Sequence, residues 1–219
     1  MINNLIGISG RINSGKDTVG KILQALAYKG SENFKLTPEE QIKGTVYLNH
    51  SYQIKKFADK TTEAFELITG VNYHKLSRED KEVVRPQYVE FAEKQKEIFD
   101  EDVWINALFD DYRIIGDKSY DDKFLPVYPN WIITDVRFPN EDQAIKDRGG
   151  IVIRVNKDKF SYQSDLPETA SPIEHAERGK ELHYHSSETA LDDHEFDYVI
   201  ENNDSIEELV EKVKQLNLV

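Results

Sequence analysis

The sequence predicts an α/β fold that is built on a parallel β-sheet. An apolar strand pattern at residues 5–9 leads through a glycine-rich stretch into an amphipathic helical pattern. Two further apolar stretches, at 131–136 and 151–155, are rich in β-branched residues and enclose a helical pattern at 140–148. Parallel strands need a crossover between them, so this strand–helix–strand spacing predicts a parallel α/β sheet.

Length and charge restrict the class of protein. The chain has 219 residues, with 41 acidic and 28 basic side chains, a net charge of −13 and no cysteine. Its length suits one globular domain with mobile segments. The acidic balance disfavours binding to nucleic acid, which needs a basic face, and the lack of cysteine excludes disulfides, thiolate catalysis and cysteine-ligated zinc. No apolar run reaches the ~18–20 residues of a membrane helix and no secretory signal is recognisable, so we expect a cytoplasmic protein without membrane contact.

The remaining elements follow in chain order. Residues 29–50 are polar, contain two glycines and a proline, and predict a loop or insertion without an assigned role. Residues 52–58 predict a short strand, and 59–110 a strongly charged helical segment. Residues 156–185 form a polar excursion with two prolines, and loops of this length are often functional lids. A last strand is expected at 196–200.

The final helix is predicted by its start signal and by its apolar spacing. Ser205 and Glu208 stand three residues apart and form a candidate capping box. The apolar residues that follow recur at helical spacing, so one face of this helix is expected to pack on the sheet.

The strongest functional signal lies between the first strand and the first helix. It reads GRINSGKDT from Gly10 to Thr18 and completes the pattern G-x-x-x-x-G-K. Its glycines allow backbone conformations in which successive N–H groups point into a concavity that holds phosphate oxygens. The helix N-terminus adds partial positive charge, and Lys16 reaches the outer phosphates. The residues predicted to bind ATP are Gly10, Asn13, Ser14, Gly15, Lys16, Asp17 and Thr18.

One position departs from the usual pattern. Ser or Thr normally follows the lysine and ligates Mg²⁺ with its hydroxyl, but here the residue is Asp17. Asp17 either ligates Mg²⁺, directly or through water, or only favours the helix N-terminus by its charge. Thr18 is then the natural hydroxyl donor to an inner phosphate.

Asp135 and Arg137 stand at the end of a predicted strand, the edge at which α/β sheets bind ligands. Asp135 is predicted to hold Mg²⁺ together with Asp17, the alternative being a helix cap or a surface ion pair. Arg137 should point the same way as Asp135, and its planar guanidinium suits a phosphate. The alternative for Arg137 is an ion pair with Glu141.

Several motifs together resemble the phage-type deoxynucleoside monophosphate kinases. They are GRINSGKDT, TDVRFPNE followed by RGGIVIRV, HSSETALDDHEFDYVIENND, FADK at 57–60, and Arg85 upstream of DEDVWINAL at 100–108. These motifs are spread over almost the whole chain. The resemblance implies a P-loop NTPase-type three-layer sandwich that forms a single kinase domain over 1–219. Within it, 59–110 would bind the acceptor and 156–185 would be the lid.

The resemblance also implies an activity. The γ-phosphoryl group of ATP would be transferred, with Mg²⁺, to a deoxynucleoside 5′-monophosphate in the cytoplasm, that of a host if the chain is viral. Lys16, Asp135 and Arg137 would be the catalytic residues. The residues implied to bind the acceptor are Phe57, Arg85, Trp104, Asp135, Arg137 and Glu188. Glu188 belongs to an H-x-S-E block with His185 and Ser187.

Other interpretations remain open. A second small P-loop kinase class, acting on dephospho-coenzyme A or another phosphorylated metabolite, needs the same ATP site. A non-catalytic ATP-binding protein is a third, favoured by the unusual Asp17.

Arg154 and Arg178 either move in with the lid or are surface arginines. The remaining groups weighed are a metal site at His183, His185 and Glu188, for which a structural role is preferred, and an acidic turn at Asp192, Asp193 and Asp197, expected to be solvated. A homodimer is common at this size, but the sequence identifies no interface.

Overall fold

The computed structural model describes residues 4–27, 52–117, 126–157 and 186–219. The chain divides into two compact units. The first, here called the sheet unit, comprises Met1–Ile54 and Asn130–Val219. The second, here called the helical unit, comprises Lys55–Pro129 and contains the whole of the expected helical segment 59–110.

A parallel sheet forms the centre of the sheet unit. In the described part of the chain it has five strands in the order β2-β5-β1-β6-β7, so that β1 is central and pairs with β5 and β6. The α/β class and the parallel sheet predicted from the sequence are therefore confirmed. The strands are β1 (Leu5–Ser9), β2 (Tyr52–Lys55), β5 (Asn130–Val136), β6 (Ile151–Asn156) and β7 (Tyr198–Glu201).

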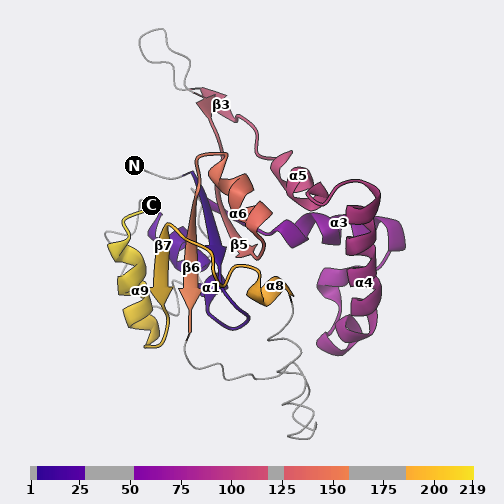
Figure 1. Cartoon of the computed structure of the whole chain (residues 1–219), viewed down its shortest axis with the longest axis horizontal. Coiled ribbons are helices and arrows are strands. Elements are labelled where there is room, and N and C mark those ends of the chain that lie inside the picture. The colour runs from indigo at the N-terminus through magenta and orange to yellow at the C-terminus, as the bar shows by residue number, and fades with distance from the viewer. Residues whose placement is uncertain (1–3, 28–51, 118–125, 158–185) are drawn as a thin grey trace, which may run out of the picture. The chain divides into compact units, whose positions relative to one another are not determined.

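Helices cover both faces of this sheet (Figure 1). The helices described in the unit are α1 (Lys16–Leu26), α6 (Pro139–Lys146), α8 (Ser186–Thr189) and α9 (Ile206–Gln215). Ile6 and Ile8 of β1 join a buried apolar cluster with residues of α1 and α9. Gly7 lies between them and faces the other side, where a Cβ atom would come within 2.7 Å of Ile145 of α6. Because side chains alternate along a strand, α1 and α9 cover one face and α6 the opposite one.

Local signals place several elements where the sequence predicts them. Strand β1 has the predicted bounds. The last helix begins after Ser205, whose hydroxyl accepts the backbone N–H of Glu208 at 3.3 Å. The Glu208 carboxylate accepts the backbone N–H of Ser205 at 3.3 Å, which confirms the capping box.

The predicted strand at 52–58 is too long. Strand β2 ends at Lys55, and helix α3 (Phe57–Thr69) begins two residues later. The Asp59 carboxylate accepts the backbone N–H of Lys56 at 2.8 Å, which satisfies a donor that the first helical turn leaves open. Phe57 and Ala58, which the apolar pattern assigned to the strand, therefore belong to the first turn of α3.

The last strand begins later than predicted. Strand β7 starts at Tyr198 instead of residue 196. The Phe196 ring lies outside the strand, 5.5 Å from the guanidinium carbon of Arg154. The Asp197 carboxylate accepts the backbone N–H of Val152 at 2.8 Å, and the Asp197 backbone N–H donates to the Val152 carbonyl at 3.2 Å, so the chain first bonds to β6 at Asp197.

The helical unit is built around aromatic contacts. The Phe65 ring meets Tyr73, Tyr88 and Phe91 edge-on, with centroids 5.4–6.2 Å apart. The predicted helical character of 59–110 is confirmed, with an interruption at Gly70, whose φ of +73° ends α3. The further elements are η3 (Tyr73–Lys75), α4 (Arg78–Ile98), α5 (Val103–Phe109), β3 (Gly116–Asp117) and β4 (Pro126–Val127). Among the helices that the structure describes, none is long and apolar enough to cross a bilayer.

Candidate functional site

The glycine-rich loop follows the central strand and leads directly into α1. Gly15 stands at the helix start with φ +95°, and Asn13 also has a positive φ, +61°. The backbone N–H of Ser14 donates to the Arg11 carbonyl at 3.1 Å, which closes a turn within the loop. The loop therefore has the backbone conformation that a glycine at position 15 permits and that most other residues disfavour.

Lys16 is the first residue of α1 and folds back over the loop. Its side chain is buried, and Nζ lies 3.5 Å from the Arg11 carbonyl oxygen. A hydrogen bond of this length is weak. The ammonium group and the open N–H groups at the start of α1 together favour an anion at this place.

The loop lies at a switch in the direction of the chain. Strands β1 and β5 are neighbours, but β1 continues into α1 on one face and β5 into α6 on the other. Open α/β sheets bind ligands beyond the carboxyl ends of two strands that diverge in this way. The residues after β1 and the end of β5 therefore border the expected ligand position.

An irregularity in β5 marks the same place. Gly7 of β1 pairs with Ile133, but Ser9 pairs with Val136, so β5 carries one extra residue around Thr134 and Asp135. Bulges of this kind reorient side chains and are common beside functional sites. Here the Thr134 hydroxyl donates to the Asp17 carboxylate at 3.0 Å, which connects the first turn of α1 to β5.

Asp17 and Asp135 are the residues predicted to hold Mg²⁺. Asp17 is exposed in the first turn of α1, and Asp135 is buried at the end of β5, next to Asp17's partner Thr134. In the described ranges no group of three or more His, Asp or Glu side chains is arranged to hold a metal. Mg²⁺ commonly takes only one or two carboxylates and completes its shell with water and phosphate, so the residues present fit this mode.

Arg137 is held by a carboxylate that the sequence assigned to the acceptor. Its Nη1 donates to Oε1 of Glu188 at 2.9 Å. The other oxygen of Glu188 accepts the backbone N–H of Ile12, within the loop, at 2.6 Å. Through these two contacts Glu188 connects the loop to Arg137. Its side chain is buried, at 8% exposed.

Glu141 caps the N-terminus of α6. The helix begins at Pro139, and the Glu141 carboxylate accepts the backbone N–H groups of Arg137 at 2.6 Å and of Phe138 at 3.0 Å. A carboxylate three residues into a helix commonly takes this role. Burial, together with the nearby charge of Asp135, raises the pKa of Glu141 to about 7.

The raised pKa predicts how stability changes with pH. Between its ordinary value of 4.5 and about 7, Glu141 keeps a proton in the folded chain that the unfolded chain has released. The free energy of unfolding therefore falls as pH rises through this window. Glu141→Gln removes this titration, and we expect it to stabilise the protein relative to the parent by on the order of 2 kcal/mol more at pH 8 than at pH 5. Chemical denaturation with a chelator present measures this difference.

The matched control for this prediction is Glu195→Gln, because Glu195 is an exposed glutamate of the same unit. Measured at the same pH values, this variant shows the effect of removing one carboxylate from the surface of the unit. Parallel pH profiles for the parent and Glu141→Gln would contradict the prediction.

Asp192 connects two arginines and was missed in the sequence. Its carboxylate forms an ion pair with Nη2 of Arg11 in the loop and accepts Nη2 of Arg154 at 3.2 Å. Arg154 also donates to the Ser9 hydroxyl at 3.1 Å and to the Asn156 side chain at 3.2 Å. Asp192 lies in an exposed turn, as the sequence predicts, but its carboxylate binds both arginines. Arg154, at 9% exposed, is buried and is not a surface residue.

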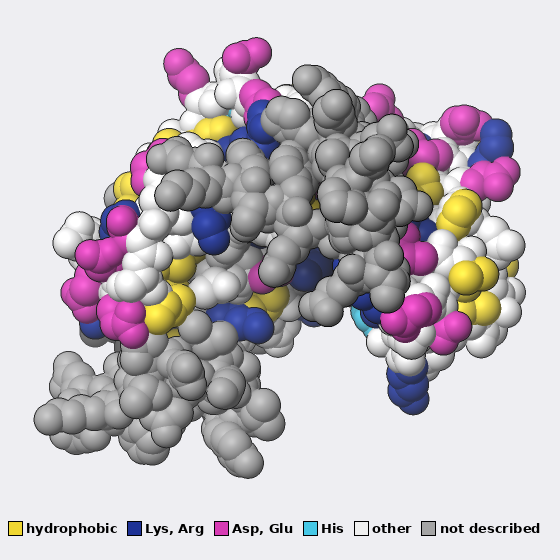
Figure 2. Space-filling view, turned by 90° about the horizontal axis from the view of Figure 1, so that it is seen from below, with side chains coloured by type: hydrophobic (Ala, Val, Ile, Leu, Met, Phe, Trp, Pro, Cys, Tyr) yellow, Lys and Arg dark blue, Asp and Glu magenta, His cyan; other side chains and the backbone are white. Residues whose placement is uncertain are grey.

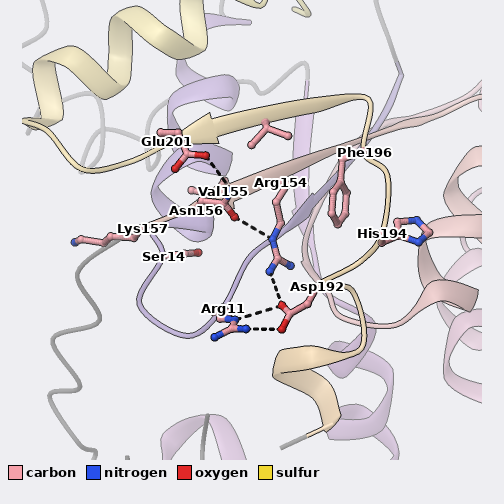
Figure 3. Close-up of a pocket in the computed structure, with 11 residues that line it drawn as sticks. Arg11, Ser14, Arg154, Val155, Asn156, Lys157, Asp192, His194, Phe196 and Glu201 are labelled. Atoms are coloured by element: carbon pink, nitrogen blue, oxygen red, sulfur yellow. Dashed lines mark hydrogen bonds and ion pairs between the residues drawn. The ribbon is translucent and has the colours of Figure 1, made fainter. Parts of the chain in front are cut away.

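A cavity of about 640 Å³ opens beside the loop. Figure 3 shows Arg11, Arg154 and Asp192 pointing toward one another at one side of it. The Phe196 ring and the end of β6 also line it. The volume is within the range of small-molecule sites, and the lining combines cationic, carboxylate, amide and aromatic groups.

The end of β7 also contacts the loop. The Asn202 side-chain amide donates to the Ser14 carbonyl at 2.8 Å, and its backbone N–H donates to the Asn156 carbonyl at 2.8 Å. A Cβ atom on Gly15 would lie 2.3 Å from the Asn202 amide nitrogen. The loop is therefore closely packed against the chain that follows β7.

Three of the expected acceptor residues belong to the helical unit. Phe57 is buried and meets Phe109 edge-on, with ring centroids 5.9 Å apart. The Trp104 indole N–H donates to the Ala92 carbonyl at 3.1 Å. Arg85 is exposed, and its Nη1 lies 3.4 Å from a Glu82 carboxylate oxygen. Their contact with an acceptor stays a prediction.

Other expected residues lie outside the described ranges. These are residues 29–50, nearly all of 156–185, and the side chains of Arg178, His183, His185 and Ser187.

Figure 2 shows the molecule from the end at which the strands of the sheet finish. Lys and Arg side chains are visible there among Asp and Glu side chains, although the whole chain has a net charge of −13.

A comparison with protein-family models found none that matches this chain, and a comparison with curated proteins found no match either.

Proposed function

We propose that this protein is a Mg²⁺-dependent phosphotransferase of P-loop NTPase-type fold, which transfers the γ-phosphoryl group of ATP to a deoxynucleoside 5′-monophosphate. The observation that carries the proposal is the loop between β1 and α1. It combines a left-handed Gly15 at the helix start with a Lys16 ammonium folded over the loop. This arrangement suits a chain of phosphates better than any other common ligand.

The surroundings of the loop support a nucleotide as the donor. A cavity of about 640 Å³ adjoins the loop and contains room for a base and ribose beyond the phosphates. Arg11 and Ser14 of the loop line it. ATP would then place its phosphates against the loop and its nucleoside in or near this cavity.

Asp17 and Asp135 would hold the metal. When bound, Mg²⁺ neutralises charge on the phosphate oxygens. Thr134, which contacts Asp17 at 3.0 Å and precedes Asp135, keeps the first turn of α1 close to the end of β5. The two carboxylates are therefore carried by adjoining elements.

The acceptor needs positioning rather than activation. A monophosphate oxygen is already a nucleophile at neutral pH. It forms a bond to the γ-phosphorus while the bond from that phosphorus to the bridging oxygen breaks, and ADP leaves with the electron pair. Arg137 and Lys16 supply positive charge around the moving group. The choice of a deoxynucleotide as acceptor rests on the resemblance of the motifs at 10–18, 134–141 and 185–204.

The test is a coupled ADP-release assay with Mg·ATP and each deoxynucleoside monophosphate in turn. We expect release that depends on at least one of these acceptors and that stops when a chelator removes Mg²⁺. Release with only dephospho-coenzyme A or another phosphorylated metabolite would replace the proposal by a different small-molecule kinase. ATP binding without acceptor-dependent release would indicate a non-catalytic ATP-binding protein.

A further inference from the structure

Two carboxylates from one short segment bind three arginines of the sheet unit. Glu188 and Asp192 stand four residues apart, in α8 and the turn that follows it. Glu188 binds Arg137, and Asp192 binds both Arg11 and Arg154. These arginines come from three different places in the sequence: the loop after β1, the end of β5, and β6.

We propose that Glu188 and Asp192 are positioning residues for phosphoryl transfer. Glu188 holds the Arg137 guanidinium beside the phosphate-binding loop, and Asp192 holds the Arg11 guanidinium at the border between the loop and the cavity. The proposal rests on the function proposed above and adds two residues that act through arginines rather than on substrate.

Glu188 is suited to fix Arg137 relative to the loop. One oxygen accepts the backbone N–H of Ile12 at 2.6 Å, and the other accepts Nη1 of Arg137 at 2.9 Å. The side chain of Glu188 is buried, whereas that of Arg137 is 37% exposed. A long exposed arginine loses conformational freedom when it is ordered. A carboxylate already anchored to the loop backbone keeps the arginine ordered before substrate binds.

Asp192 is held in place by an arginine that is itself fixed to the sheet. Arg154, its buried partner, is held by the Ser9 hydroxyl at 3.1 Å and by Asn156 at 3.2 Å. Ser9 is the last residue of β1, so Arg154 is fixed to the strand from which the loop begins. Asp192 binds this fixed arginine and also forms an ion pair with Arg11, so it restrains the position of the Arg11 guanidinium (Figure 3).

Amide substitution disrupts each contact with little change in shape. Both partners of Glu188 are N–H donors, and so are both partners of Asp192. Gln or Asn offers one acceptor oxygen, and its NH₂ group faces the second donor. The arginine should then lose its fixed position while the fold persists.

The experiment compares cognate and crossed double-mutant cycles. We expect Glu188→Gln to lower kcat by about tenfold with little change in the KM for ATP, since small misplacements of a positioned group are costly in the transition state. We expect Asp192→Asn to weaken ATP binding by about tenfold, because Arg11 lines the nucleotide cavity. In an Arg137→Gln background Glu188→Gln should add almost nothing, and Asp192→Asn should add almost nothing to Arg11→Gln.

The crossed pairs and a neighbouring aspartate are the controls. The effects of Glu188→Gln and Arg11→Gln should come closer to multiplying than those of a cognate pair, because Glu188 meets this part of the loop at the Ile12 backbone rather than at the Arg11 guanidinium. Asp193→Asn should leave kcat and ATP affinity unchanged, since Asp193 is exposed and has no bond to the described residues. Cognate effects that multiply as fully as the crossed ones would overturn the proposal. So would a variant with higher ATP affinity, which would show that the carboxylates compete with phosphate.

Two readouts do not depend on transfer. The midpoint of thermal unfolding reports whether the cognate contacts form, and calorimetric ATP affinity reports whether Asp192 acts on the ligand. If the parent protein releases no ADP with any acceptor, the proposed function fails and these readouts decide the inference. Coupling of Asp192→Asn to Arg11→Gln in ATP affinity would then retain Asp192 as a positioning residue, and unchanged affinity would reject it.

Discussion

Replacing Lys16 by alanine is expected to lower acceptor-dependent ADP release by about 10²–10³-fold, the usual loss when one group that stabilises transition-state charge is removed. Lys16 is the only cation of the described chain that both begins α1 and folds over the glycine-rich loop. Its ammonium would neutralise charge on the phosphates as the γ-phosphoryl group leaves. The measurement is the coupled assay at saturating Mg·ATP and acceptor.

The matched control is Lys21→Ala, five residues further along the same helix. Lys21 is half-buried and lies away from the loop sequence, so its removal should leave the rate within about twofold of the parent. Equal losses in the two variants would mean that a general change of charge, rather than the position of Lys16, explains the effect. Full activity in Lys16→Ala would contradict the assignment of the ATP site.

Gly15→Ala is expected to destabilise the protein by about 2 kcal/mol and to weaken ATP binding at least tenfold. A φ of +95° is strained for alanine, at a cost of roughly 1–2 kcal/mol. The new Cβ would also lie 2.3 Å from the Asn202 amide, which must then give up its hydrogen bond to the Ser14 carbonyl. Chemical denaturation and calorimetric titration with ATP measure the two effects.

Gly149→Ala separates backbone strain from contact with Asn202. Gly149 follows α6 in the same unit, has φ +75°, and no atom lies within 4 Å of an added Cβ. The free energy of unfolding of the Gly149→Ala variant should fall by only roughly 1 kcal/mol, the cost of a left-handed alanine. The ATP affinity of this variant should not change. A loss of ATP affinity in Gly149→Ala would show that the method reports global destabilisation instead of loop geometry.

The parts of the fold that could be predicted carry their signals in neighbouring residues. The first strand, the loop and α1 are adjacent in the chain. The start of α9 is indicated by Ser205 and Glu208, which stand three residues apart and form its capping box. The error at residues 52–58 has a local cause as well. The apolar pattern continues through Phe57 and Ala58, but Asp59 starts a helix by capping Lys56, and this cap outweighs strand propensity.

The candidate site was harder to predict because its contacts are distant in sequence. Asp192 is 181 positions from Arg11 and 38 from Arg154. Nothing local distinguishes Asp192 from its neighbour Asp193, and both residues are exposed. The extra residue in β5 was equally hidden, since a buried parallel strand is apolar throughout and has no alternation that could reveal a shift in register.

The contact between Asn202 and Ser14 has a consequence for the order in which the chain is made and folded. The loop is synthesised before the partners that hold it, which are Thr134, then Glu188 and Asp192, and finally Asn202, 188 positions after Ser14. Contacts between such distant segments form slowly, because the chain must first lose the entropy of a long closed loop. A growing chain that stops before Asn202 lacks the last of these partners. The loop is therefore made before all of these partners and reaches its final conformation only after the last of them has been added.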